Sequence, residues 1–345
     1  MIARPLSSRS SHRKSHRMRA SAAPLALAAL LAAGAPALAC DRMEKVTAAW
    51  LPIMQTTAYY VALEEKLFEK ACIEISSAKM ESPNHIIDAL VSGRADFGPP
   101  GAAAGIAMVA EQKFPGTFKV FGLQGGGIKV DRINDGLIVK PDSPIQTFMD
   151  LKGKTLGHVP GIQWRTIARH LVRESGLDPD KDVKLVDLAV AMQVPAVVGG
   201  TADATLSLEP VGSIAAASGK AKRAMVNPVA AVIADPFYSG ASLITVRFLK
   251  ERPAVAKKVV EVIDQATALV NADFDKYKKV LPKYTAIREE QLPSVAQPYL
   301  RGFSDINEVD TASYQALVDV FIKEGVLSGP LDVRTKMLTA ADLGS

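Results

Sequence analysis

The sequence predicts an α/β fold with two similar lobes, each built on a parallel or mixed sheet, around a cleft, with helices added at the C-terminal end. Segments with the pattern of strands alternate with segments with the pattern of helices, which favours parallel sheets. The whole pattern also occurs twice, at an offset of 107 to about 109 residues, which indicates two related lobes.

Each half begins with a strand, a polar loop and a helix. Residues 46–51 and 59–67 are the first strand and helix of one half, and residues 155–159 and 166–175 are those of the other. In open α/β sheets, ligands bind outside the carboxyl ends of the strands. Two such lobes therefore predict a cleft for a small molecule between them.

The repeat is clearest where a Gly-x-Ala-Asp sequence ends a helix and precedes a strand. Residues 93–96 and 200–203 carry this sequence, 107 residues apart, and each follows an apolar helical run. We expect Asp96 and Asp203 to fix the turn between helix and strand in both lobes.

After Pro236 the pattern changes to a return strand and a mostly helical segment. The strand is expected at 241–246, and the helices, which would cover the first lobe, at 253–271, 274–281, 289–299 and 311–323. Crossings near 136–140 and 237–241 predict a first lobe of residues 40–136 plus 241–345 and a second lobe of 137–240. Two crossings permit hinge closure on a ligand.

Residues 1–39 have the composition of a cleavable export signal. A basic, Ser-rich start precedes a short run of small apolar residues and the cleavage pattern Ala37-Leu38-Ala39. Six of the 41 Lys and Arg residues and none of the 36 Asp and Glu residues lie here, so residues 40–345 carry 35 basic against 36 acidic side chains. A nearly neutral body has no general attraction to nucleic acid. We expect an exported protein.

The chain has two cysteines, Cys40 and Cys72, and cleavage places Cys40 first in the mature protein. We predict a disulfide between them, because each precedes a strand of the first lobe and an exported protein meets an oxidising compartment. Lipidation of Cys40 is the alternative, although Pro36 and Ala37 stand where larger apolar residues are preferred. Two free thiols are the third possibility.

Five segments occur in an order that is typical of one protein family: Trp50-Leu51-Pro52, then residues 59–68, 93–98 and 150–157, and finally Glu209-Pro210. With these segments the chain resembles the periplasmic substrate-binding proteins of ABC importers, in the group that binds nitrate, sulfonates, taurine and thiamine precursors. The resemblance implies a bilobal periplasmic binding protein fold of type II, no catalysis, and delivery of a solute to an inner-membrane permease. Leu208 departs from the family, which often has Trp at this position.

The first-lobe loop over residues 50–60 leaves a strand and opens a helix, whose first N–H groups are free to meet a ligand. Gln55 is polar at its apex. Thr56 and Thr57 either cap the helix or offer hydroxyls to a ligand. Because Tyr59 and Tyr60 are adjacent, we expect only one of them to face the core and the other to line the cleft.

The equivalent loop of the second lobe covers residues 160–166. Gly161 allows close backbone approach, and Gln163, Trp164 and Arg165 follow at a helix start. A cation is misplaced there unless an anion binds beside it; a salt bridge or a solvated side chain is the alternative for Arg165. Trp164 either stacks on a flat ligand or covers a lobe edge.

Further candidates come from the other loops. Ser82 either caps a helix that starts at Pro83 or meets the ligand, and Glu209 pairs with a ligand amine or with Arg165. The predicted ligand-binding residues are Trp50, Gln55, Thr56, Thr57, Tyr59, Ser82, Asn84, Pro100, Gly101, Gly161, Gln163, Trp164, Arg165 and Glu209. No catalytic residue, metal site or cofactor is predicted, since the sequence has no ligand-spaced histidines, nucleophile elbow or phosphate loop.

The expected function is capture of a small organic anion, such as a sulfonate or carboxylate, for an ABC permease. We expect a monomer that binds no nucleic acid. A pyrimidine thiamine precursor or an aromatic acid is the alternative ligand, and a periplasmic ligand-sensing module is an alternative role. An enzyme of pyrimidine synthesis is disfavoured, because the related enzymes carry a Cys- and His-rich motif that is missing here.

Overall fold

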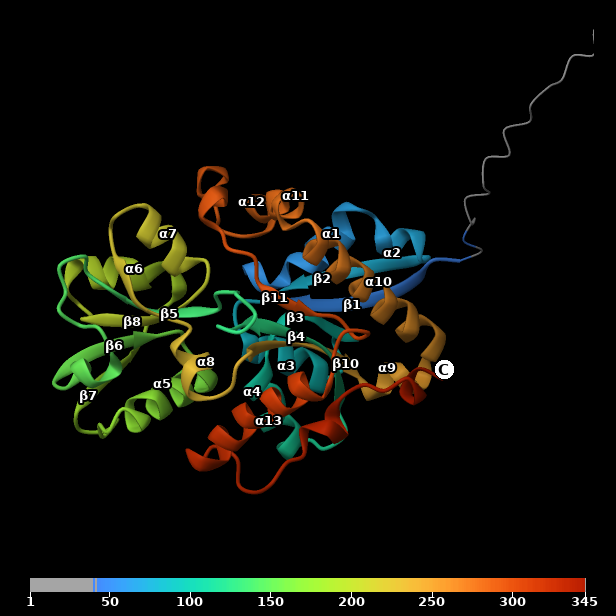
Figure 1. The fold of residues 1–345 in the computed structure, drawn as a ribbon. Helices are drawn as coiled ribbons and strands as arrows, with labels where there is room; N and C mark the ends of the chain where they lie inside the picture. The colour runs from blue at the N-terminus through green and yellow to red at the C-terminus, as the bar shows by residue number, and fades with distance from the viewer. Residues whose placement is uncertain (1–39, 41, 345) are drawn as a thin grey trace, which may run out of the picture. The chain divides into compact units, whose positions relative to one another are not determined.

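The computed structural model describes residues 40 and 42–344, which belong to one compact unit; the expected export signal lies outside the described residues. Two sheets organise this unit, as predicted (Figure 1). The six-stranded sheet has the order β11-β4-β10-β3-β1-β2, and the five-stranded sheet has the order β7-β6-β8-β5-β9. We call each sheet with its helices the first and the second lobe, respectively.

The strands of the first lobe are β1 (Glu44–Trp50), β2 (Ile73–Lys79), β3 (Phe97–Ala103), β4 (Phe118–Gly126), β10 (Phe237–Thr245) and β11 (Tyr299–Arg301). Those of the second lobe are β5 (Asp135–Val139), β6 (Lys154–His158), β7 (Val183–Asp187), β8 (Ala204–Leu208) and β9 (Lys222–Val226). In each sheet three strands of one repeat run parallel, β2-β1-β3 and β7-β6-β8, and an antiparallel strand, β10 or β5, follows. The lobe boundaries within the crossings stay a prediction.

The two Gly-x-Ala-Asp sequences have the same role in both lobes. The Asp96 carboxylate accepts a hydrogen bond from the Thr47 N–H at 2.9 Å, and the Asp203 carboxylate accepts one from the Thr155 N–H at 2.8 Å. Each aspartate thus ties the turn before the third strand of its lobe to the first strand. Because these contacts recur at the repeat offset, the two aspartates are structural, as expected.

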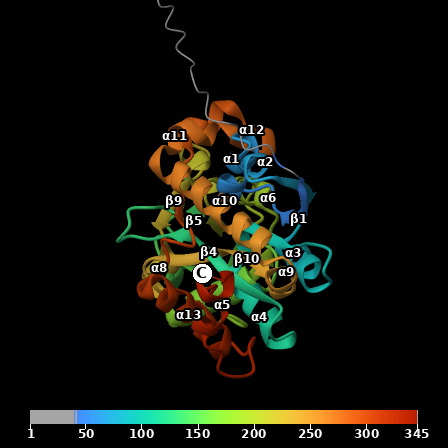
Figure 2. The same cartoon turned by 90° about the vertical axis from the view of Figure 1, so that its right-hand side faces the viewer.

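Helices cover both faces of the first-lobe sheet. The turned view separates α1 and α10 on one face from α4 and α13 on the other (Figure 2). The helices of this lobe are α1 (Thr57–Glu64), α2 (Leu67–Lys70), α3 (Pro83–Val91), α4 (Ala104–Lys113), α9 (Val246–Glu251), α10 (Pro253–Ala272), α11 (Phe274–Tyr277), α12 (Leu281–Tyr284) and α13 (Glu308–Lys323).

The helices of the second lobe are α5 (Ile162–Glu174), α6 (Val190–Gly199), α7 (Val211–Ala217) and α8 (Pro228–Val232). Short 3₁₀ turns complete the described chain: η1 (Met54–Thr56), η2 (Phe148–Leu151), η3 (Lys278–Val280), η4 (Glu289–Ser294), η5 (Val333–Lys336) and η6 (Ala341–Leu343). None of the described helices is long and apolar enough to cross a membrane.

One predicted helix and one predicted orientation are wrong. Residues 289–299 form η4 and the start of β11 instead of a helix, since Pro293 and Pro298 lack the N–H donors that a helix needs. Tyr59 and Tyr60 are both fully buried, because α1 is enclosed on two sides. The Tyr59 hydroxyl meets Ser77 at 2.8 Å, whereas Tyr60 stacks on Tyr284 with ring centroids 4.5 Å apart.

The predicted disulfide is confirmed. Cys40 and Cys72 are bonded, with their Cα atoms 5.5 Å apart. Cys40 precedes β1 and Cys72 precedes β2, and these strands are parallel neighbours, as the prediction required. The bond joins the start of the described chain to the edge of the first-lobe sheet.

Candidate functional site

A cavity of about 340 Å³ lies between the two sheets, at the carboxyl ends of their parallel strands. Most of its lining residues follow β1, β2, β6 or β7, so both lobes contribute to it. The lining residues are Leu51, Pro52, Ile53, Gln55, Glu81, Ser82, Pro83, Gly101, Ala103, Ile106, Val159, Pro160, Gln163, Trp164, Ala189, Val190, Leu208, Ser239 and Gly240.

The internal repeat reappears in the cavity wall. Residues separated by 107 or 108 positions line the cavity as equivalent members of the two lobes. The pairs are Leu51 and Val159, Pro52 and Pro160, Gln55 and Gln163, Ser82 and Ala189, Pro83 and Val190, and Gly101 and Leu208. Each lobe thus contributes an equivalent half of the cavity wall.

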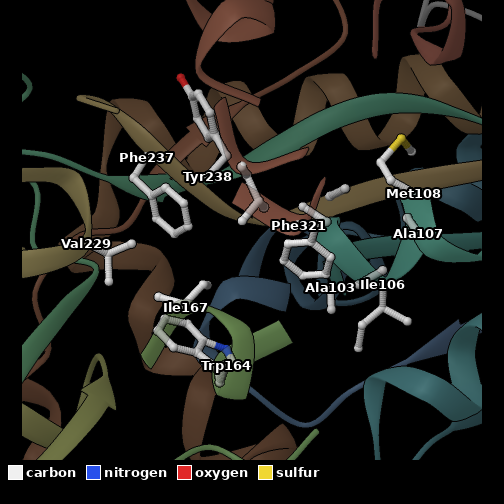
Figure 3. Close-up of a cluster of buried hydrophobic side chains, with 14 of the residues drawn as sticks. Ala103, Ile106, Ala107, Met108, Trp164, Ile167, Val229, Phe237, Tyr238 and Phe321 are labelled. Carbon is white, nitrogen blue, oxygen red and sulfur yellow. The ribbon is translucent and has the colours of Figure 1, made fainter. Parts of the chain in front are cut away.

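Most of the wall is apolar. Figure 3 shows Trp164 and Ile167 of α5 in the same cluster of buried side chains as Ala103 and Ile106 of the first lobe. Trp164, Ala103 and Ile106 line the cavity and also belong to a hydrophobic cluster that extends through both lobes. A solute in this cavity would therefore contact a large apolar surface that ends at a few polar groups.

The polar groups are those of two glutamines, two serines, one glutamate, the indole of Trp164 and the main chain. The Gln163 side chain is only 2 % exposed; its Oε1 accepts the Gly105 N–H at 2.7 Å and its Nε2 donates to the Ser239 carbonyl at 2.8 Å. Gln55 donates from Nε2 to the Glu209 carbonyl at 3.3 Å. Both glutamines line the cavity, and each also contacts the opposite lobe.

The start of α5 offers backbone donors beside the cavity. Gly161 is its N-cap and supplies no side-chain acceptor, so the first N–H groups of α5 lack both an intrahelical partner and a cap. Pro160, Gln163 and Trp164 around this start all line the cavity. The helix dipole adds partial positive charge at this position.

Arg165 does not line the cavity. Arg165 is exposed, whereas Gln163 and Trp164 beside it are buried. Glu209 is buried and does not pair with Arg165; its Oε1 accepts from Arg223 at 2.6 Å. Among the described residues, no Lys, Arg or His side chain lines the cavity, and Glu81 is its only charged lining residue.

The other predicted residues divide between the cavity and its surroundings. Ser82 lines the cavity and also caps α3, where its hydroxyl accepts the His85 N–H at 3.4 Å. Gly101 lines the cavity, and its N–H donates to Gln124 at 2.9 Å. Outside the lining lie Trp50, Thr56, Thr57, Tyr59, Asn84, Pro100, Gly161, Arg165 and Glu209.

The surroundings explain several of these positions. Trp50 packs edge-on against Tyr60, with ring centroids 5.4 Å apart, inside the core of the first lobe. The Thr57 hydroxyl donates to the Met54 carbonyl, so it stabilises η1. Asn84 borders a separate groove between α3 and α4.

The sequence predictions missed most of the apolar lining. Ala189 and Val190 could have been found, because the repeat offset of 107 places them opposite Ser82 and Pro83. Ser239 and Gly240 carry no comparable signal, since β10 joins the sheet antiparallel to β3 from a distant part of the chain.

Two buried titratable groups flank the site. His158, which ends β6 beside Val159, has its pKa lowered by burial, against the hydrogen bond to the Val159 carbonyl. Burial raises the pKa of Asp135, at the first crossing between the lobes, to about 6. No group of three or more His, Cys, Asp or Glu side chains in the described part of the chain is placed to hold a metal ion.

A family comparison agrees with this geometry. The sequence model of the NMT1/THI5-like family matches residues 53–275, which include the whole second lobe and most of the first-lobe strands. The chain belongs to the NMT1/THI5-like family. No curated protein matches the chain in sequence.

Solved structures show the same fold as this NMT1/THI5-like chain. The periplasmic aliphatic sulphonate-binding protein SsuA of Escherichia coli is 18% identical, with a TM-score of 0.68 over 86% of this chain and 92% of that one. The periplasmic nitrate-binding protein NrtA of Synechocystis PCC 6803 is 12% identical, with a TM-score of 0.65 over 85% and 84%. The desulfurization enzyme DszB is 15% identical, with a TM-score of 0.66 over 87% and 98%. The predicted bilobal periplasmic binding protein fold is therefore confirmed.

Proposed function

We propose that the protein captures a small organic solute in this cavity and delivers it, in the periplasm, to the membrane permease of an ABC importer. The observation that carries the proposal is the cavity itself, because residues of both lobes surround it at the carboxyl ends of their strands. A solute that contacts both lobes favours the closed arrangement of the two. The family match and the fold shared with sulfonate- and nitrate-binding proteins support the importer role.

The proposed solute is an organic anion with an apolar body, such as a sulfonate or carboxylate. Its body would pack against Ile53, Ile106 and Trp164, which are among the lining residues. Its charged group would meet the uncapped N–H groups at the start of α5, where the helix dipole favours an anion. Arg165 has no part in this arrangement, because it is exposed outside the cavity.

A flat ring is the second candidate. Trp164 presents an aromatic surface to the cavity, and such a surface suits stacking on a pyrimidine or an aromatic acid. This candidate shares the apolar wall with the first one but does not need the negative charge. The two differ in whether ionised solutes are preferred over neutral ones of equal size.

We propose a binding protein and not an enzyme. Because DszB is an enzyme of the same fold, the fold alone does not decide between them. The DszB structure in complex with biphenyl-2-sulfinic acid is of a cysteine-to-serine mutant. Here both cysteines of the chain form the disulfide, so no thiol is left for nucleophilic chemistry.

A thermal-shift screen of the purified protein tests this proposal. The screen compares alkyl and aryl sulfonates, carboxylates, pyrimidines, and neutral and cationic analogues of similar size. A ligand at 100 times its Kd stabilises the folded state by about 2.7 kcal/mol, so a true solute should raise Tm clearly. Stabilisation by neutral or cationic solutes alone contradicts the anion class, and absence of any stabilising solute contradicts solute capture.

A further inference from the structure

Gln55 and Gln163 stand 108 residues apart, at equivalent positions of the two lobes. We propose that this pair holds the lobes closed over the solute through reciprocal hydrogen bonds to the opposite lobe, as positioning residues and not as solute ligands. The inference deepens the proposed function, on which it rests, because closure is the step that encloses a solute. It assigns a separate role to two of the lining residues.

Gln163 reaches from the second lobe into the first. It is the second residue of α5, and its carboxamide contacts α4 and β10 of the first lobe. Its acceptor oxygen and one of its amide hydrogens are engaged there, with distances of 2.7 and 2.8 Å. A side chain that is 98 % buried and hydrogen-bonded at both ends has little capacity left for a solute.

The contact with Gly105 replaces a helix cap. Ala103, the N-cap residue of α4, has no side-chain acceptor, and Gly105 is the second residue of that helix. An N-cap side chain normally accepts the N–H of the second or third helical residue. Gln163 accepts this N–H from the other lobe, so α4 is capped only while the lobes are together. If the lobes separate, the Gly105 N–H and the Ser239 carbonyl lose these hydrogen bonds and become exposed to water.

Gln55 makes the reciprocal contact. It lies in η1 of the first lobe, is 5 % exposed, and donates to the Glu209 carbonyl of the second lobe. Glu209 follows β8, the third strand of its lobe, and Ala104 and Gly105 follow β3, the third strand of theirs. Each glutamine thus reaches the segment after the third strand of the opposite lobe. These two contacts across the cavity favour one relative orientation of the lobes, because a hydrogen bond forms only at a short distance and a suitable angle.

Amide hydrogen exchange on the full-length protein, with no solute added, tests the pair. Gln163→Met keeps the length of the side chain and removes its hydrogen bonds, so exchange of the Gly105 amide should rise by about tenfold or more. Gln55→Met should raise exchange at Gly105 by about threefold, although Gln55 does not touch Gly105, because it favours separation of the lobes. A purely local role of Gln163 would not produce this second effect.

Two further measurements complete the test. The radius of gyration from small-angle scattering should increase in both variants, and Gln146→Met, at an exposed position of the second lobe, should change neither quantity. Gln163→Glu, which keeps the acceptor and replaces the donor facing Ser239, should also open the lobes if Gln163→Met does not fold. Unchanged Gly105 exchange and unchanged radius in the Gln55 variant and in either Gln163 variant would overturn the proposal. Because no solute is used, these results are independent of whether a solute is found.

Discussion

At the scale of single residues, Gln163 and Arg165 show how far a helix position determines a role. Both lie in the first turn of α5, but Gln163 is buried at the cavity and Arg165 is exposed. Successive residues of a helix point about 100° apart, so two positions on one turn face different surroundings. The sequence offered two roles for Arg165 at this helix start, anion binding or a salt-bridged or solvated side chain, and its exposed position outside the cavity lining favours the second.

The first prediction concerns Arg165. With a solute that stabilises the protein, Arg165→Ala should leave Kd within about twofold, because an exposed charge outside the cavity is largely screened. Isothermal titration calorimetry at physiological ionic strength measures this. A loss of more than about tenfold would mean that Arg165 reaches the solute and would support the original sequence prediction.

The second prediction concerns Asp135, at the crossing from the first lobe to the second. The carboxylate accepts from Asn134 at 2.8 Å and from the Val229 N–H at 3.2 Å, but burial is dominant and raises its pKa from 3.8 to about 6. A raised pKa means that the folded state retains a proton that the unfolded chain loses. The contribution of this group to stability is therefore full below pH 3.8 and is lost as the pH rises through about 6.

Asp135→Asn should isolate this effect, since an amide does not titrate. The free energy of unfolding of the variant minus that of the natural protein should increase by about 2 kcal/mol between pH 4 and pH 7. Urea unfolding at pH values across this range measures the difference. A difference that is independent of pH would show that Asp135 titrates normally.

At the scale of elements, an ionic cluster joins α5 of the second lobe to the end of α13 of the first. The Glu324 carboxylate, with a side chain 2 % exposed, accepts from Nε and a terminal nitrogen of Arg173, each at 3.1 Å, and lies 3.4 Å from Nδ1 of His170. Burial acts to raise the pKa of the Glu324 carboxyl, but the hydrogen bonds from Arg173 and the neighbouring His170 ring hold it below its ordinary value. The carboxylate therefore stays ionised between the two lobes.

The third prediction is that Glu324→Gln destabilises the protein by about 2 kcal/mol. The cost of removing one partner of a buried pair is reduced here, because Arg173 is partly exposed. The contribution of Glu324 is present above its ordinary pKa and is lost as the pH falls through the lowered value. Glu174→Gln is the matched control: Glu174 pairs with Lys323 between the same helices, but both side chains are exposed, so we expect a much smaller loss of stability. Equal effects in chemical denaturation would contradict the role of burial.

The fourth prediction concerns the disulfide. Cys40 and Cys72 are separated by 32 positions, and closing a loop of this length stabilises the folded state by about 3.5 kcal/mol through the unfolded chain. Replacing both cysteines by serine should lower Tm by several degrees and leave the solute Kd unchanged, since the bond lies away from the cavity lining. Calorimetry of the variant, compared with the reduced natural protein, tests this; a Tm within one degree of the oxidised protein would contradict it.

Elements that repeat were predictable and elements that occur once were less so. The strands around the Gly-x-Ala-Asp sequences could be predicted from local pattern, and the disulfide from its place before two of these strands. Both predictions rely on a unit of parallel strands whose order is fixed. The segment after Glu289 failed, since its two prolines break a pattern that otherwise has helical composition. Tyr60 is covered by Tyr284, more than 220 residues away, and no local pattern reveals this contact.

At the scale of the whole molecule, the repeat predicted two lobes and a cleft at the carboxyl ends of their strands. The repeat could not predict which side chains line the cavity. For example, Ser239 and Gly240 come from β10, a strand that lies outside both repeats. Of the predicted residues, those that line it are Gln55, Ser82, Gly101, Gln163 and Trp164. The aromatic candidates Trp50 and Tyr59 do not line the cavity, because both pack in the hydrophobic core of the first lobe.

The central claim is that a solute binds between the lobes, and Trp164 reports on it directly. The chain has two tryptophans, and of these only Trp164 lines the cavity. In a Trp50→Phe protein, titration with the most stabilising organic anion should change the Trp164 emission along a saturating one-site curve, with the Kd that calorimetry gives. A solute that binds with one-to-one stoichiometry and leaves the Trp164 emission unchanged would bind elsewhere and contradict the claim.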